Sequence, residues 1–180
     1  MSTPFFYPVA EATGSVLPPS DSAAIPLPVR QLVANLRGPR APLVRTAVLA
    51  LGPSHYASAP EQWAASLQLA PRHLALHIAD RLEAQGRTEL FIGPDELLTY
   101  VLELLPAATS ADPAEPGVWV WGADILLARL TETQRRTFWA NLRQRVSKRP
   151  PLLLALPATV LARFGPEQPV EWGTRFAALP

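Results

Sequence analysis

The chain has 180 residues, no cysteine and a net charge of +1 at neutral pH. This length is enough for one domain with a sizeable core, and the lack of cysteine excludes disulfides, thiolate metal sites and cysteine nucleophiles. The near-zero charge gives no overall case for binding nucleic acid or a membrane surface. With three histidines, no apolar run near about 18 residues and no basic-then-apolar start, we expect no metal site, no membrane span and a cytoplasmic protein.

Residues 1–28 hold six of the 21 prolines and are predicted to form an extended arm, because proline removes backbone donors and blocks helix interiors. Residues 29–180 are predicted to form a single domain. Its first half is predicted to contain a helix at 29–36, a strand at 46–51, a helix at 60–69, a helix at 73–85 whose start alternates like a strand, and a short strand at 89–92. Its second half is predicted to contain a helix at 94–105, a loop at 106–117, a strand at 118–121, a helix within 131–149, a strand at 152–156, a short helix at 160–164 and a strand at 172–179.

Two apolar runs decide the fold class. Residues 118–121 read Val-Trp-Val-Trp, and residues 152–156 read Leu-Leu-Leu-Ala-Leu, with a polar, Arg-rich segment between them. Strands that are buried on both faces give continuous apolar runs, and parallel neighbours are joined by a crossover helix. We therefore predict an α/β domain with a mostly parallel sheet of about five strands and helices on both faces. The strands at 46–51, 118–121 and 152–156 should be central neighbours.

Three elements resemble those of P-loop NTPases of the RecA/AAA type, over roughly residues 43–179. They are a strand ending in a glycine turn at Gly52, an apolar strand followed by Asp124, and a later strand followed by Thr159. In that family the glycine loop wraps the phosphates, the acid orients magnesium and the third element carries a polar sensor. The resemblance implies that Gly52, Ser54 and Asp124 correspond to the nucleotide site.

The chain departs from that family where phosphate would bind. The turn at Gly52 lacks a second glycine and the Gly-Lys-Ser/Thr ending, and Lys148 is the only lysine in the sequence. Asp124 comes two residues late and suits a helix cap equally well. We therefore expect no active NTPase and no bound cofactor, and leave weak nucleotide binding open.

Within this superfamily the chain is similar to the small P-loop protein of BREX-type phage-defence systems. The likeness rests on the chain length, the early Gly52 turn and the order of a Leu-rich helix, an apolar strand and Asp124. It implies a non-hydrolysing, NTPase-like subunit that acts as an adaptor or scaffold in a DNA-associated phage-defence or repair assembly. A protein partner is then expected first.

Residues 61–78 support a different interpretation, because they resemble the first helix-turn-helix unit of AraC-type regulators. Leu67 and Leu69 would flank the turn, in which Gln68 stands in place of the usual glycine. Arg72 and His73 would open the recognition helix and face DNA. The alternative function is therefore a DNA-binding regulator.

The segment from Arg129 to Arg149 has an unusual charge. It contains seven basic residues and one acid, Glu132. Phe138, Leu142 and Val146 recur every four positions and predict one buried stripe on a helix, which Lys148 and Arg149 should end. The arginines outside this stripe are predicted to bind either an acidic protein surface or nucleic-acid phosphate. The alternative is that they only form a solvated helix face. They are Arg135, Arg136, Arg143 and Arg145.

Overall fold

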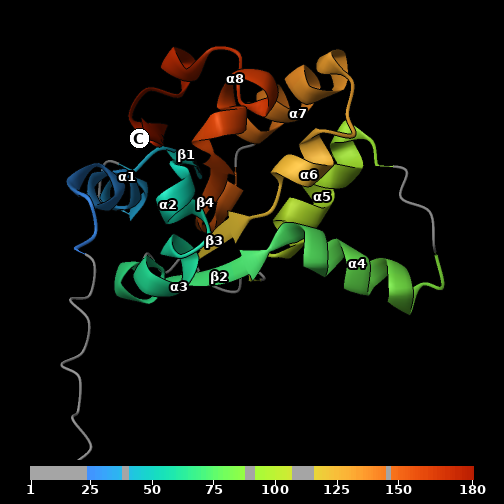
Figure 1. Ribbon diagram of the computed structural model, residues 1–180, viewed down its shortest axis with the longest axis horizontal. Helices are drawn as coiled ribbons and strands as arrows, with labels where there is room; N and C mark the ends of the chain where they lie inside the picture. The colour runs from blue at the N-terminus through green and yellow to red at the C-terminus, as the bar shows by residue number, and fades with distance from the viewer. Residues whose placement is uncertain (1–23, 38–40, 88–91, 107–115, 145–146) are drawn as a thin grey trace, which may run out of the picture.

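Figure 1 shows the computed structural model, which describes residues 24–37, 41–87, 92–106, 116–144 and 147–180. Five strands form one sheet in which every pairing is parallel, in the order β2-β3-β4-β1-β5. The strands are β1 (Val44–Leu51), β2 (Leu69–His73), β3 (Gly117–Trp121), β4 (Ser147–Pro157) and β5 (Phe176–Ala178). The predicted α/β fold with a parallel sheet is confirmed.

The three strands predicted to be central are neighbours. β4 lies between β3 and β1, with Leu154 paired to Val120 on one side and to Val48 on the other. All three side chains are fully buried. The apolar runs are thus continuous because helices cover both faces of the sheet.

Helices cover the two faces of the sheet as separate layers (Figure 1). They are α1 (Leu27–Arg37), α2 (Pro53–Tyr56), α3 (Ala59–Trp63), α4 (Leu74–Ala84), α5 (Pro94–Glu103), α6 (Asp124–Leu127), α7 (Glu132–Gln144) and α8 (Leu161–Phe164), with 3-10 turns η1 (Ala65–Leu67), η2 (Ala158–Val160) and η3 (Pro169–Arg175). One core joins α1 and α3 to the sheet, and the other joins it to α4, α5, α6 and α7. Trp119 belongs to the first core and meets Trp63 of α3 edge to face at 6.4 Å.

The helix-turn-helix geometry predicted for residues 61–78 is not formed. Residues 69–73, which should contain the turn and the start of the recognition helix, make strand β2. β2 pairs with β3, Ala70 opposite Val118 and Arg72 opposite Val120. The local pattern of this segment favoured a turn followed by a helix. Pairing with β3 satisfies its backbone N–H and C=O groups in a strand instead, so a tertiary contact outweighed the local preference.

Two further boundaries differ from the prediction. Lys148 and Arg149 do not end a helix, because α7 stops at Gln144 and β4 begins at Ser147. Pro150 explains this, since the residue before a proline is pushed out of the helical region. The first half of the predicted last strand, residues 172–175, lies in the 3-10 turn η3, whose Gly173 has a φ of 52°, and Phe176–Ala178 pair with β1.

The helix after the predicted arm begins at Leu27, so Pro28 lies inside its first turn, where a proline costs no helical hydrogen bond. Other predictions lie outside the described residues: those for residues 1–23, for most of the strand at 89–92 and for Arg145. None of the described helices is long and apolar enough to cross a membrane.

Candidate functional site

The carboxyl ends of β1, β3 and β4 meet at one edge of the sheet because the strands are parallel. The helices after β1, α2 and α3, lie against one face, whereas the helices after β3, α6 and α7, lie against the other. Open α/β sheets bind their ligands at the carboxyl ends of the strands, where such a reversal occurs. Gly52, Ser54 and Asp124, the residues predicted for a nucleotide site, are brought to this edge.

A tyrosine from the β1 loop links the two loops at this edge. The Tyr56 hydroxyl donates to Asp124 Oδ1 at 2.9 Å and accepts from the backbone N–H of Gly122 at 2.9 Å. Gly122 has a φ of 75°, a conformation that glycine adopts without cost. We call these three residues the Tyr56 node. Asp124 therefore binds a side chain of the same molecule, and it caps no helix, since the N-cap of α6 is Ala123.

The electrostatics of the Tyr56 node keep the tyrosine neutral. Burial raises the pKa of Tyr56 far above its usual value, and the negative charge of Asp124 raises this pKa further. The Gly122 amide acts in the opposite direction, because its hydrogen bond favours the phenolate. A neutral hydroxyl can donate to Asp124, so the node persists through the alkaline range in which free tyrosine ionises.

The glycine turn after β1 does not form a phosphate cradle. The N–H groups of His55 and Tyr56 both donate to the Gly52 carbonyl and start α2, so they are not free for an anion. A Cβ on Gly52 would lie 2.3 Å from the carbonyl oxygen of Pro180, which shows how closely the segment after β5 covers this turn. Ser54 is exposed on α2.

His73 and Arg72, the residues predicted to face DNA, differ in how far the molecule's own contacts engage them. His73 is the N-cap of α4: its Nδ1 accepts from the N–H of Leu76, and its ring stacks edge to face on Trp121 at 5.3 Å. The same ring lies against Gly122. Arg72 is exposed and borders a groove of about 720 Å³ beside β2. Both side chains line this groove, and of the two His73 is the one engaged by contacts within the described residues.

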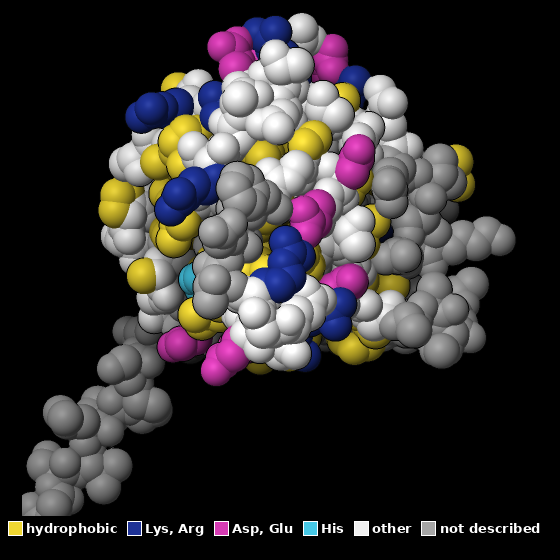
Figure 2. Space-filling view, turned by 90° about the vertical axis from the view of Figure 1, so that its right-hand side faces the viewer, with side chains coloured by type: hydrophobic (Ala, Val, Ile, Leu, Met, Phe, Trp, Pro, Cys, Tyr) yellow, Lys and Arg dark blue, Asp and Glu magenta, His cyan; other side chains and the backbone are white. Residues whose placement is uncertain are grey.

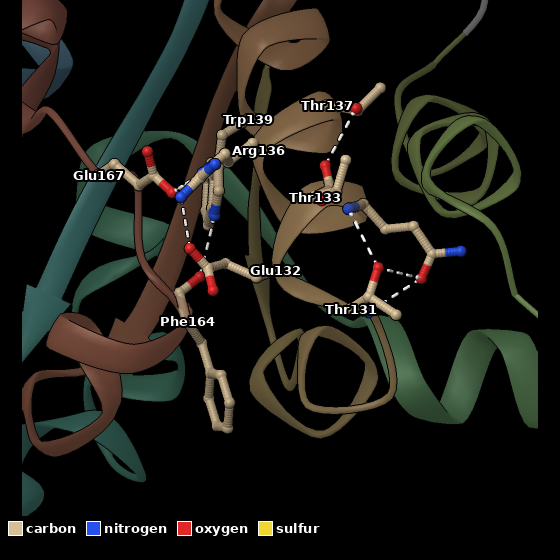
Figure 3. Close-up of polar contacts among 9 residues, drawn as sticks. Thr131, Glu132, Thr133, Arg136, Thr137, Trp139, Phe164 and Glu167 are labelled. Carbon is tan, nitrogen blue, oxygen red and sulfur yellow. Dashed lines mark hydrogen bonds and ion pairs between the residues drawn. The ribbon is translucent and has the colours of Figure 1, made fainter.

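The arginines of α7 are largely engaged within the molecule. Figure 3 shows Arg136 between two carboxylates, those of Glu132 on its own helix and of Glu167. Its ion pair with Glu167 raises the pKa of the guanidinium, and Glu132 adds to this effect. Arg135 donates to the backbone carbonyl of Leu130. Thus the helix face that was predicted to be unpaired draws carboxylates from a distant segment.

That distant segment is the chain between α8 and β5. Arg143 pairs with Glu171 at 2.6 Å, four residues further along the same segment from Glu167. The indole N–H of Trp139 donates to the Phe164 carbonyl at 2.9 Å (Figure 3). These contacts join α7 to residues 164–171. Positive and negative side chains are also interspersed on the side of the molecule shown in Figure 2, which carries α4 to α7.

The described part of the chain holds no group of three or more His, Cys, Asp or Glu side chains arranged for a metal ion. Comparison with protein-family models, with characterised proteins and with solved structures finds no significant match.

Sequence reasoning missed Tyr56, Glu167 and Glu171. Tyr56 lies in α2 at the glycine turn after β1, and its partners Gly122 and Asp124 are 66 and 68 residues further along the sequence. The one available signal was topological: loops that follow parallel strands meet at the same edge, so a polar aromatic residue in one loop can reach an acid in the other. Glu167 and Glu171 are spaced four residues apart, as are ion-pair partners on a helix, but nothing local assigns them to α7.

Removing the Tyr56 hydroxyl should destabilise the protein. In Tyr56→Phe the half-buried Asp124 carboxylate loses a donor and the buried Gly122 N–H loses its acceptor, which we expect to lower the free energy of unfolding by about 1–3 kcal/mol. Urea denaturation at neutral pH would measure the change.

The same variant should alter the response to high pH. Because the pKa of Tyr56 is raised in the native state, the unfolded chain loses the proton first, and stability contributed by Tyr56 is present below about pH 10 and falls above it. Tyr56→Phe should show a shallower fall between neutral and strongly alkaline pH. An equally steep fall in the variant would show that Tyr56 does not contribute; Tyr100, whose pKa burial also raises, supplies the shared background.

Proposed function

We propose that this chain is a non-catalytic, NTPase-like subunit that acts as an adaptor in a larger assembly. The observation behind this proposal is the Tyr56 node. The strand with the glycine turn, the strand before Asp124 and the strand between them lie side by side, as the resemblance to RecA/AAA-type domains requires. At their carboxyl edge the N–H of Gly122 is bonded to the Tyr56 hydroxyl. The N–H groups of His55 and Tyr56 are bonded to the Gly52 carbonyl, so these donors are not available to the phosphates of a nucleotide.

The described residues at this edge include no lysine to neutralise a phosphate group. Phosphoryl transfer depends on positioning and on positive charge around the phosphates. The only lysine is Lys148, in β4, and Asp124 is bound to Tyr56. A domain with this order of strands but without a lysine at its glycine turn is suited to holding other proteins together.

The resemblance to the BREX-type P-loop protein supports placing this adaptor in a DNA-associated assembly. The regulator alternative is less well supported, because residues 69–73 form a strand and the His73 ring packs on Trp121. Direct phosphate contact by α7 is also less favoured, since Arg136 and Arg143 already pair with carboxylates. Through these contacts the molecule is better suited to a protein partner than to a nucleic-acid backbone.

A nucleotide assay tests the non-catalytic part of the proposal. Phosphate release from ATP and GTP with magnesium, with and without duplex DNA, should stay below about 1 per minute, far under the usual range for enzymes. Titration with a fluorescent ATP analogue should show no saturable binding near micromolar concentrations. Turnover above that level that disappears in Asp124→Ala would mean that the domain is an enzyme, and the proposal would be wrong.

A further inference from the structure

A second groove lies between α7 and α8, away from the Tyr56 node. It has a volume of about 600 Å³, within the range of about 300–1,000 Å³ that ligand sites occupy. Its apolar lining includes Trp139, Leu161, Pro166 and Pro169. The rim carries arginines and glutamates from both helices and from the segment after α8. We call this the α7–α8 groove.

The walls of the α7–α8 groove are held in place by buried contacts. Trp139 is 4% exposed, packs edge to face on Phe138 at 5.1 Å and on Trp172 at 6.0 Å, and binds the Phe164 carbonyl. Arg136 ties Glu132 of α7 to Glu167 across the opening. Since α7 is fixed to the chain beyond α8, the groove is preformed and a partner would meet little ordering cost.

The charges on the rim are unequal. Two arginines, Arg135 and Arg163, have no carboxylate partner among the described residues, whereas both glutamates of the rim are occupied by Arg136. Arg135 and Arg163 both lie over the ring of Phe164, at 5.5 and 5.2 Å from its centre. Arg163 is exposed and has no other partner in the described chain. A guanidinium with unused donors therefore borders an apolar groove.

We propose that the α7–α8 groove docks a peptide segment of a partner protein that presents an acidic side chain beside a large apolar one. The carboxylate would bind Arg163, which offers planar paired donors. The apolar side chain would lie on Leu161 and Pro169, which line the groove and are partly exposed. This chemistry fits a protein better than a nucleic-acid backbone, because a backbone phosphate has no large apolar side chain beside it to fill the groove next to Arg163.

This inference deepens the adaptor role proposed above and rests on it for the identity of the partner as a protein. The binding itself is independent of nucleotide. Hydrolysis by the domain would contradict the adaptor role without bearing on the groove, whereas failure of peptide binding would remove the groove and leave the nucleotide result unchanged.

The test uses the full chain and fluorescein-labelled peptides of Gly and Ser that contain one Glu next to one Leu or Phe, in either order. Each peptide has a control in which Gln replaces the Glu. In fluorescence anisotropy at low salt, at least one Glu peptide should bind about tenfold more tightly than its Gln counterpart. Arg163→Ala should remove this preference, and Arg163→Lys should restore part of it. Arg30→Ala, an exposed arginine on the opposite face, should change nothing.

The melting temperature of each variant is measured alongside, and it should not move, because the Arg163 side chain is exposed. The proposal is overturned if no peptide binds, or if Glu and Gln peptides bind alike. It is also overturned if a labelled DNA oligonucleotide binds more tightly than every peptide and loses that binding in Arg163→Ala, since the groove would then be a nucleic-acid site.

Discussion

Replacing Trp139 by alanine is expected to lower the free energy of unfolding by about 3–5 kcal/mol, the usual cost of removing a buried tryptophan. The side chain is 4% exposed, contacts Phe138 and Trp172, and its indole N–H is bonded to Phe164. At this chain length the change corresponds to a fall in melting temperature of roughly 6–20 °C. Thermal and urea denaturation would measure it.

Two controls separate packing from the hydrogen bond. Trp139→Phe keeps a ring in the same position and loses the bond to the Phe164 carbonyl, so it should cost only about 1–2 kcal/mol. Thr137→Ala changes an exposed residue on the same helix and should stay within about 0.5 kcal/mol. A loss in Trp139→Ala no larger than in Thr137→Ala would show that α7 does not pack against the segment after α8 as described.

Gly122→Ala is expected to cost about 2–4 kcal/mol and to disrupt the Tyr56 node. The backbone φ of 75° strains any residue with a Cβ, and the added carbon would lie 2.4 Å from the ring of His73. Relief requires moving His73, which caps α4 and stacks on Trp121. The free energy of unfolding would be measured by urea denaturation.

Gly86 supplies a matched control for this prediction. Its φ is 64°, similar to that of Gly122, but a Cβ there would meet nothing within 4 Å. Gly86→Ala should therefore show the backbone cost alone, about 1–2 kcal/mol. The difference between the two variants measures the contact with His73 and the loss of the Tyr56 node. Equal costs would mean that the turn after β3 is not packed against α4.

The strongest features of the fold followed from short stretches of sequence. Residues 118–121 and 152–156 predicted central strands because a strand buried on both faces needs apolar side chains in both directions, and the structure places β3 and β4 side by side. Proline and glycine marked many of the boundaries, as at Pro94, the first residue of α5, and Gly86 after α4. The lack of a phosphate-binding lysine at the glycine turn was likewise visible in the composition.

Other features were decided by tertiary structure alone. β2 contains Pro71 and Arg72, has no apolar run, and is a strand because β3 offers it hydrogen bonds. As an edge strand it tolerates the missing donor of a proline. Local pattern could not distinguish this strand from a helix-turn-helix, since the stabilising partner lies more than 40 residues further along the chain.

The candidate sites show the same division. The sequence alone determined which residue types were present: an acid after β3, a glycine turn after β1 and a run of arginines on α7. Only the tertiary structure decided that Asp124 binds Tyr56 and that Arg136 and Arg143 meet Glu167 and Glu171. The physical reason is that the state of a charged or polar group depends on what lies within a few ångströms of it, and those neighbours come from segments that chain order does not bring together.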